Sequence, residues 1–386
     1  MRYPAYKPTG LAWLPEVPRE WEMLRLKSCF YERKENNRSS NQMMILSLMK
    51  DIGVIPYDEK GDVGNKSKDD ISQYKVARKG DLVLNSMNVI IGSVGVTPYD
   101  GLISPAYYSL VPRENVLARF YEFMFRLPAV QQAFRGYAKG IMEIRLRIST
   151  IDLLGMKFPV PPPAEQEAIV AYLDEKTAKI DRLIELKERE IKLLNEKKQA
   201  VISKVVTRES GDAIAVKYLV QINNGFDPTT EGDTPVYGSG AESFKTCGEF
   251  KIGPTVLLGR KGATLHIPHY VEGKYWNVDT AFDVKPLTEG LDLRFFYYCA
   301  TCFDYRRFIS QTTLPSMTKS DYGRMKIPRL SLPEQREIVA YLDAEGAKTD
   351  KAIAAVTRQI GLLKEYRTRL ISDAVTGQID LRKEDC

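Results

Sequence analysis

The chain has 386 residues, 44% hydrophobic and 27% charged, which is typical of an ordinary globular protein of two to four domains. No apolar run approaches the ~18 residues that a membrane span needs, and no apolar signal-peptide region begins the chain. Five unevenly spaced cysteines exclude a disulfide framework, so we expect a cytoplasmic protein. The net charge of +6 permits nucleic-acid binding without requiring it.

Residues 1–157 are expected to form a mixed α/β domain with many short strands. The apolar run GDLVLNSMNVIIGSVGV, from Gly80 to Val96, is broken by Gly and Asn, which is typical of short strands joined by turns. An aromatic stretch from Phe120 to Phe134 predicts a helix, and the polar, basic loop RGYAKGIMEIRLR follows it.

Residues 158–210 are expected to form one long helix. The chain has neither Pro nor Gly from Ala164 to Glu209, and apolar residues recur there at steps of three and four. About forty residues at ~1.5 Å per residue would give a rod about 60 Å long. The stripe that we expect to pack against a second helix consists of Ile169, Leu173, Ile180, Leu183, Ile191 and Leu194.

The second half of the chain repeats this order. Residues 211–327 are expected to form another α/β domain, with short strands in GPTVLLGRKGATLHI, an aromatic helical stretch and the polar loop SQTTLPSMTKSD. Residues 328–386 are expected to form a second long helix and a tail, although Gly346 and Gly361 weaken the helix by about 1 kcal/mol each relative to Ala. The apolar stripe of this helix consists of Ile338, Leu342, Ile353, Val356, Ile360 and Leu363.

Nearly the same seventeen residues occur twice. EQEAIVAYLDEKTAKID starts at Glu165, and EQREIVAYLDAEGAKTD starts at Glu334. The two copies align without a gap over residues 165–207 and 334–376. A long helix with a narrow apolar stripe needs a partner helix, so we expect the two copies to pack against each other. The alternative is that each helix lies on a domain surface and faces solvent.

Together these motifs resemble the specificity subunit of a Type I restriction–modification system. Similar stretches are YKPTGLAWLPEVPREWEMLRLK near the start, GDLVLN followed by SPAYYSLVP, and AVTGQIDLR near the end. PVPPPAEQEAIVAYLD and LSLPEQREIVAYLD resemble the starts of the two conserved helical regions of that family. The most specific signal is the pattern EQ-x2-IV-x-YLD, which occurs twice, each time after proline and a divergent domain.

The resemblance implies an α/β (α+β) fold in which two target recognition domains alternate with two helices. The helices would pair as an antiparallel coiled coil, with a pseudo-two-fold internal repeat. Each domain would read one half of a bipartite double-stranded DNA site with a fixed gap. Two modification (methyltransferase) subunits would dock on the chain, restriction (translocase and nuclease) subunits would join them, and the chain itself would carry no chemistry.

The sequence predicts neither a catalytic site nor a cofactor site. Ser104-Pro105-Ala106-Tyr107 lacks the second proline of an adenine methyltransferase motif, and no suitable glycine-rich cofactor loop accompanies it. A phosphate-binding G-x-x-x-x-G-K-[ST] loop is absent from the sequence. We therefore expect a non-catalytic subunit, and a fused enzyme is disfavoured.

A zinc site is the one metal centre that the sequence raises. His266, His269, Cys299 and Cys302 offer two nitrogen and two sulfur ligands, which is a tetrahedral zinc set. The two cysteines lie in an apolar helical stretch, where Cys packs as a small hydrophobic residue. We therefore expect no metal, and a zinc assay would decide between the two interpretations.

The candidate DNA contacts are polar and basic loop residues at corresponding places in the two domains. Base edges and phosphates are contacted by the same side-chain types, so residue type alone does not separate these roles. The candidates are Asn85, Ser86, Asn88, Lys139, Arg145, Arg147, Lys245, Arg260, Lys261, Gln311, Thr312 and Thr313. The alternative for each is a surface residue without a contact. The alternative for the whole chain is a coiled-coil scaffold whose globular domains bind protein rather than DNA.

Overall fold

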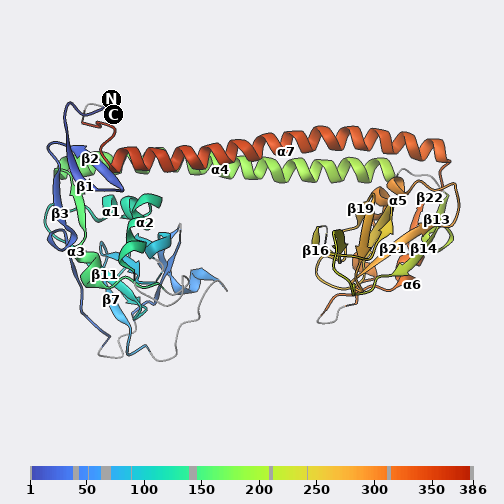
Figure 1. Ribbon diagram of the computed structural model, residues 1–386, viewed down its shortest axis with the longest axis horizontal. Helices are drawn as coiled ribbons and strands as arrows, with labels where there is room; N and C mark the ends of the chain where they lie inside the picture. Colours follow the sequence, from blue (N-terminus) through green and yellow to red (C-terminus); the bar gives the residue numbers. More distant parts are fainter. Residues whose placement is uncertain are drawn as a thin grey trace. The chain divides into compact units, whose positions relative to one another are not determined.

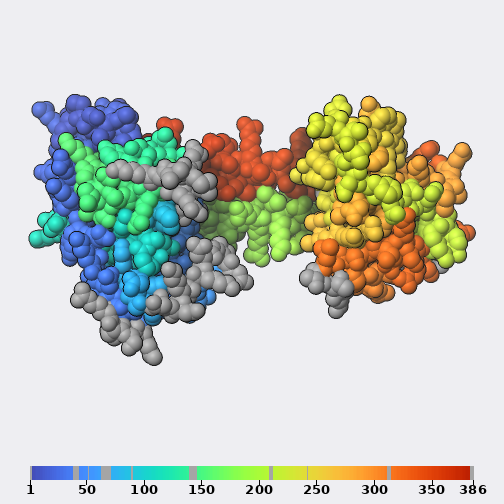
Figure 2. All heavy atoms as spheres, turned by 60° about the horizontal axis from the view of Figure 1, so that its bottom comes forward, coloured from blue at the N-terminus to red at the C-terminus, as the bar shows by residue number. Residues whose placement is uncertain are grey.

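The computed structural model describes residues 2–37, 43–50, 52–61, 71–87, 89–138, 146–207, 212–240, 242–310 and 314–382. It divides into two compact units (Figure 1, Figure 2). Unit 1 comprises residues 1–186 and 359–386, and unit 2 comprises residues 187–358. The long helices α4 (Pro163–Val206) and α7 (Leu332–Val375) each contribute a part to both units.

Unit 1 is built around an antiparallel four-stranded sheet with the strand order β4-β11-β8-β9. Helix α1 (Ala118–Phe125) packs on β8 and β9, and its buried rings Phe120, Tyr121 and Phe125 form part of the main core. Helix α2 (Pro128–Tyr137) contacts α1, and α3 (Thr150–Gly155) contacts α2. The strands of unit 1 are β1 (Tyr6–Leu11), β2 (Leu14–Pro18), β3 (Glu22–Arg25), β4 (Phe30–Glu32), β5 (Leu46–Met49), β6 (Gly53–Pro56), β7 (Lys75–Ala77), β8 (Leu82–Asn85), β9 (Val94–Val96), β10 (Gly101–Ile103), β11 (Tyr107–Pro112) and β12 (Lys157–Val160).

Unit 2 contains a sheet with the strand order β14-β21-β18-β19 and a second sheet with the order β16-β15-β20-β17. Helix α5 (Leu293–Ala300) packs on β18 and β19, and α6 (Lys319–Arg324) follows the polar loop of this unit. The strands of unit 2 are β13 (Ala213–Ala215), β14 (Val220–Asn224), β15 (Thr234–Tyr237), β16 (Ser243–Cys247), β17 (Lys251–Ile252), β18 (Thr255–Gly259), β19 (His269–Val271), β20 (Lys274–Asn277), β21 (Ala281–Pro286) and β22 (Lys326–Pro328).

The main sheets of the two units have the same topology, although their sequences diverge. In unit 1, Leu84 pairs with Tyr108, and in unit 2, Leu258 pairs with Phe282 at the matching step of the ladder. The outer pairs β3-β12 and β13-β22 also correspond, because each joins the start of a domain to the strand before a long helix. The predicted fold class, two mixed α/β domains combined with a long helix pair, is therefore confirmed.

The two long helices are antiparallel in both units. In unit 1, Arg367 Nε donates to Asp181 Oδ1 at 2.8 Å, and in unit 2, Lys198 Nζ donates to Asp350 Oδ1 at 2.7 Å. Residues later in α4 therefore pair with residues earlier in α7, which is the antiparallel arrangement. Both helices are 44 residues long, but no helix of the described chain is long and apolar enough to cross a membrane.

The less exposed positions along these helices recur in heptads, as in a coiled coil. In α4 the positions that follow this heptad spacing are Leu173, Thr177, Ile180, Ile184, Lys187, Ile191, Leu194, Lys198, Val201 and Val205. In α7 they are Leu342, Gly346, Thr349, Ile353, Val356, Ile360, Leu363, Arg367, Leu370 and Ala374. The prediction of Leu183 in this stripe is wrong, because the heptad places Ile184 against the core and leaves Leu183 42% exposed. Of the other predicted stripe residues, Ile169 is buried in the unit 1 core and Ile338 packs against the unit 2 core.

The two ends of the chain lie together in unit 1, beside the last turn of α7 (Figure 1). Tyr6 Oη donates to the carbonyl of Gly377 at 2.9 Å, and Arg382 bonds to Glu20 at 2.7 Å. Gly377 has φ +72°, and a Cβ atom there would lie 2.3 Å from Pro18, so both the turn and the packing require glycine. The N-terminal hairpin β1-β2 and the residues after α7 are thus packed into one structure.

Candidate nucleic-acid interface

In each unit, the two loops that carry most of the predicted DNA contacts are joined by a backbone hydrogen bond. In unit 1, the amide of Ile148 donates to the carbonyl of Ser86 at 3.2 Å, which ties the segment before α3 to the loop after β8. In unit 2, the amide of Met317 donates to the carbonyl of Arg260 at 2.9 Å, which ties the segment before α6 to the loop after β18. The same pair of loops therefore meets at the same edge of both main sheets.

The side chains of the unit 1 loop after β8 are turned into the protein. Asn85 and Ser86 are buried, and Asn85 Oδ1 accepts a hydrogen bond from the amide of Met87 at 3.1 Å. Their burial corrects the prediction that these two side chains contact DNA, because a contact requires exposed donors or acceptors. Asn88, the third candidate on this loop, lies outside the described residues.

Arg147 is exposed at the edge of unit 1. It lines a surface groove of about 690 Å³ together with Lys34, Glu32 and Tyr108. Tyr108 Oη donates to the carbonyl of Ile148 at 3.1 Å, which holds the segment that carries Arg147. Lys34 is a second exposed cation here, and the sequence analysis missed it. The candidates Lys139 and Arg145 lie outside the described residues.

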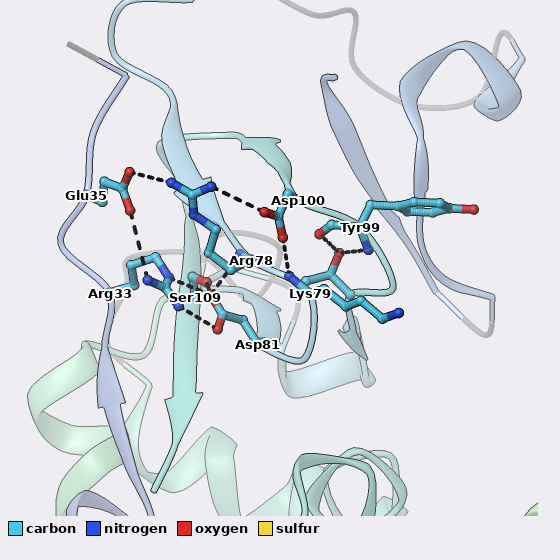
Figure 3. Close-up of polar contacts among 9 residues, drawn as sticks. Arg33, Glu35, Arg78, Lys79, Asp81, Tyr99, Asp100 and Ser109 are labelled. Atoms are coloured by element: carbon cyan, nitrogen blue, oxygen red, sulfur yellow. Dashed lines mark hydrogen bonds and ion pairs between the residues drawn. The ribbon is translucent and has the colours of Figure 1, made fainter. Parts of the chain in front are cut away.

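A network of ion pairs around a buried carboxylate holds this part of unit 1 together (Figure 3). Arg33 donates to both oxygens of Asp81, at 2.7 and 2.9 Å, and Ser109 Oγ donates to the same carboxylate at 2.6 Å. These bonds link the region after β4 to β11 and to the residue before β8, and the bond to Asp81 raises the pKa of the Arg33 guanidinium. Arg78 extends the network to Glu35 at 2.9 Å and to Asp100 at 3.2 Å.

Asp100 is the outer carboxylate of that network. The backbone amide of Lys79 donates to it at 2.8 Å, and this bond, followed by the one from Arg78, lowers the pKa of Asp100. The network ties the residues after β4 and before β8 to Ser109 on β11. We infer that its role is to position the loops.

Unit 2 has a buried carboxylate at the equivalent place in the sheet, but a different strand supplies it. Asp283 lies on β21 opposite Leu257, just as Ser109 lies on β11 opposite Val83. Lys251 Nζ binds Asp283, and Asn223 Nδ2 donates to it at 3.3 Å. The two units therefore use the same kind of support with different residues.

Arg260 and Lys261 lie on the unit 2 loop after β18. Arg260 Nη1 donates to the carbonyl of Asp279 at 3.3 Å, and its guanidinium lies 5.8 Å from the centre of the Phe282 ring. Lys261 Nζ lies 3.5 Å from Asp279 Oδ2, and both side chains are partly exposed. Gly262 follows with φ +112°, a conformation that favours glycine, and it lies close to Ser239.

The remaining candidates of unit 2 are not all on this surface. Lys245 lies on β16, in the second sheet of the unit, where its Nζ is 5.6 Å from the centre of the exposed Phe244 ring. The structure therefore brings Arg260 and Lys261 together but places Lys245 on a separate strand. Gln311, Thr312 and Thr313 lie outside the described residues.

The repeated motif contains a glutamine that anchors each domain to its long helix, and sequence reasoning did not assign this role. Gln166 Oε1 accepts from the amide of Leu117 at 2.8 Å, and its Nε2 donates to the carbonyls of Asn115 and Pro161 at 3.1 and 2.9 Å. These contacts hold the turn before α1. The side chain is 1% exposed, and the bond to Pro161 is buried, whereas the bonds to Leu117 and Asn115 are partly buried.

Gln335 makes the same three contacts in unit 2. Its Oε1 accepts from the amide of Asp292 at 2.9 Å, and its Nε2 donates to the carbonyls of Gly290 and Leu330, each at 2.9 Å. These bonds hold the turn before α5.

The aspartate that ends the repeated YLD motif also binds its own domain. Asp174 accepts from Arg119 Nη2 at 2.8 Å, and Asp343 accepts from Arg294 Nε at 2.8 Å. Both arginines are the second residue of the helix that covers the main sheet, α1 or α5. Part of the repeat is therefore explained by contacts within the chain.

The four residues weighed as a zinc set are spread over different surroundings. Cys299 is buried in the unit 2 core, and burial raises its pKa well above the ordinary value of a thiol. His269 packs beside the ring of Tyr237, with centroids 5.4 Å apart, and His266 is exposed. Among the residues that the structure describes, no group of three or more His, Cys, Asp and Glu could hold a metal ion.

Comparisons with known proteins agree with this architecture. The sequence matches the Type I restriction modification DNA specificity domain twice, over residues 18–196 and 213–360. A comparison with curated proteins finds no match.

Two solved structures have a similar fold. One comes from work on complex assembly and conformational transition of the type I R-M system, with a TM-score of 0.76 and 17% identity over 94% of this chain and 99% of that chain. The other is the HsdS subunit from Thermoanaerobacter tengcongensis, with a TM-score of 0.54 and 18% identity over 94% of this chain and 98% of that chain. Because the family match covers most of the sequence in two copies, the chain belongs to the Type I restriction modification DNA specificity domain family and is a specificity subunit of that kind.

Proposed function

We propose that this specificity subunit reads a bipartite double-stranded DNA site, with one domain for each half-site and a gap set by the helix pair. The observation that carries the proposal is the matched pair of loops, which meets at the same edge of the main sheet in both units. Reading two different half-sites requires two similar scaffolds with different exposed side chains. The scaffold positions the loops on the DNA, and the side chains determine which bases are recognised. Residues 1–157 and 211–327 are the proposed recognition domains.

The described side chains that would face DNA are cationic. Arg147 and Lys34 lie at the edge of unit 1, and Arg260 and Lys261 lie on the loop of unit 2. Arginine reads guanine through two parallel hydrogen bonds, and both arginine and lysine also bind phosphates. We propose Arg147 and Arg260 as base or phosphate contacts, and Lys34 and Lys261 as phosphate contacts.

The internal repeat also suits two identical partners. A pseudo-two-fold chain offers two nearly equivalent faces, so two modification (methyltransferase) subunits would dock on one specificity subunit. Restriction subunits would then join the assembly. In this proposal the chain holds no catalytic residue and no cofactor, and it acts by placing the methyltransferases over the two half-sites.

The methylation pattern of cellular DNA, read by long-read sequencing with this gene present or deleted, tests the proposal. We expect a split motif with a fixed unspecified gap that appears only when the gene is present. Arg147→Ala should blur one half-site and Arg260→Ala the other, whereas Arg19→Ala, at an exposed arginine away from both loops, should change neither. If the methylation pattern is unchanged although this chain and the methyltransferase subunit are both expressed, the alternative of a coiled-coil scaffold whose domains bind protein is favoured.

A further inference from the structure

Unit 2 has an open groove between the last turn of α4 and the first turns of α7. The groove has a volume of about 660 Å³. Its walls are largely apolar, with Val201, Val205, Leu330 and Ile338, and Glu334 and Tyr341 line it as well. Tyr341 contributes a large ring that is 50% exposed. No part of the proposed DNA-reading surface lines the groove.

The internal repeat identifies the same place in unit 1, where it is covered. Glu165, Ile169 and Tyr172 are the counterparts of Glu334, Ile338 and Tyr341, each 169 residues earlier in the chain. Glu165 and Ile169 are buried and Tyr172 is half-buried, whereas Glu334 is exposed and Ile338 is half-buried. The opposite wall of the groove shows the same difference in exposure. Ala374 in unit 1 is buried, whereas its counterpart Val205 in unit 2 is half-buried.

The chain's own ends cover the site in unit 1. Tyr3 Oη donates to the carboxylate of Glu165, and Tyr3, Val17 and Trp21 belong to one core cluster with Leu381, which follows α7. The cover is therefore the N-terminal segment, residues 2–21, which contains the β1-β2 hairpin and brings a tyrosine hydroxyl to the glutamate and apolar side chains to the helix ends.

Unit 2 has no counterpart of this segment in its sequence. Residues 2–21 precede β3 in unit 1, but β13 takes the place of β3 in unit 2, and only residues 207–212 join it to α4. Glu334 nevertheless keeps the position and the charge of Glu165. The amide and the hydroxyl of Ser331 donate to Glu334 Oε2 at 2.8 and 2.6 Å, and these bonds lower its pKa. Among the described residues no hydrogen bond reaches Glu334 Oε1, so this oxygen can accept from a further donor.

We propose that this groove binds a hairpin-forming segment of another protein, which places a tyrosine hydroxyl on Glu334 and apolar side chains on Ile338 and Val205. Unit 1 supplies the template for that segment. A second copy of this chain is a poor occupant, because residues 2–21 of that copy form part of its own unit 1 core, where Trp21 is fully buried. The proposal concerns protein binding and does not depend on DNA reading.

A synthetic peptide with the sequence of residues 2–21, labelled with a fluorophore at its C-terminus, is the probe. Added to the full-length chain, it should bind with a dissociation constant on the order of micromolar, measured by fluorescence anisotropy. The tethered segment of unit 1 has an effective concentration of about millimolar, so the free peptide will not displace it and will report on unit 2. A peptide with Tyr3→Phe should bind about tenfold more weakly, because a hydrogen bond to a charged group is lost.

Two tyrosines on α7 provide matched variants. Tyr341→Ser should weaken peptide binding about tenfold through lost apolar contact. Tyr366→Ser, at a ring that is 56% exposed on the same helix but lies in unit 1, should leave it unchanged. If Tyr341→Ser proves misfolded by circular dichroism, Glu337→Lys, at an exposed position in the same groove, replaces it and should weaken binding as well.

Three results would overturn the inference. They are the absence of saturable binding, equal binding to the Tyr341 and Tyr366 variants, and light scattering that shows two chains associating through the groove in place of the peptide. Each of them leaves the DNA proposal intact, because the methylation pattern is measured separately.

Discussion

Replacing Gln166 with methionine tests whether the repeated motif fixes each domain to its helix. Methionine has a similar length and no amide, so the amide of Leu117 and the carbonyls of Asn115 and Pro161 lose their side-chain partner. A buried backbone group without a partner costs about 1–3 kcal/mol. Because the groups around Leu117 and Asn115 are only partly buried and water can replace some of the bonds, we expect the free energy of unfolding of unit 1 to fall by about 2–4 kcal/mol.

Hydrogen exchange measured by mass spectrometry at increasing urea concentration separates the two units. Gln166→Met should lower the protection of unit 1 peptides, with the largest change around Asn115 to α1, and leave unit 2 unchanged. Gln335→Met, which removes the same three contacts in unit 2, should do the reverse. Gln359→Met, at an exposed glutamine on α7, should change stability by no more than about 0.5 kcal/mol.

If Gln166→Met changes stability no more than Gln359→Met does, Gln166 does not anchor the unit 1 domain to its helix. The same conclusion follows if Gln166→Met and Gln335→Met each lower the protection of both units equally, because the contacts would then not be local to one unit.

Four further outcomes are expected. Arg260→Ala should weaken specific DNA binding by about 1–3 kcal/mol in a filter-binding assay, and equal affinity would remove it from the interface. Gly361→Ala should raise the free energy of unfolding by about 0.5–1 kcal/mol, because its Cβ meets no atom within 4 Å. Glu249, whose pKa is lowered from 4.5 to about 2 mainly by the Thr229 amide, should stabilise unit 2 above pH 4.5 and lose that effect as the pH falls toward about 2; Glu249→Gln should flatten this part of the urea titration. Lengthening both long helices by one turn, about 5.4 Å, should change the DNA gap by one or two base pairs, given ~3.4 Å per base pair, as read from the methylome.

The long helices and the domain order could be predicted because their signals are repetitive. The leucines and isoleucines show that a heptad stripe exists, but they do not show which residues of the helix belong to it. Leu183 and Ile184, for example, are adjacent and both apolar. The inward positions of Lys187, Lys198 and Arg367 explain the difficulty, because polar residues interrupt the apolar pattern that a reader follows. Only the packed partner helix decides which residue of such a pair faces inward.

The candidate site was harder to predict because DNA contacts depend on exposure. Asn85 and Arg260 are both polar and lie at the end of a central strand, Asn85 as its last residue and Arg260 just after it, yet Asn85 is buried and Arg260 remains partly exposed. Gln166 and Asp174 carried a usable signal, since they are identical in both copies. The roles of Gln166 and Asp174 could not be predicted, because their partners are the turn before α1 and Arg119, which lie some fifty residues earlier in the chain.

A glycine in the first half of α7 has a consequence for how the two long helices are aligned. Gly346 leaves room for the stem of Lys198, whose Cε would lie 3.6 Å from a Cβ there while its Nζ reaches Asp350. A slip by one heptad would place Lys198 opposite a full side chain and separate it from that carboxylate. These contacts favour a single register of the two helices, so in the proposed function the DNA gap would change only when residues are inserted into or deleted from the helix pair.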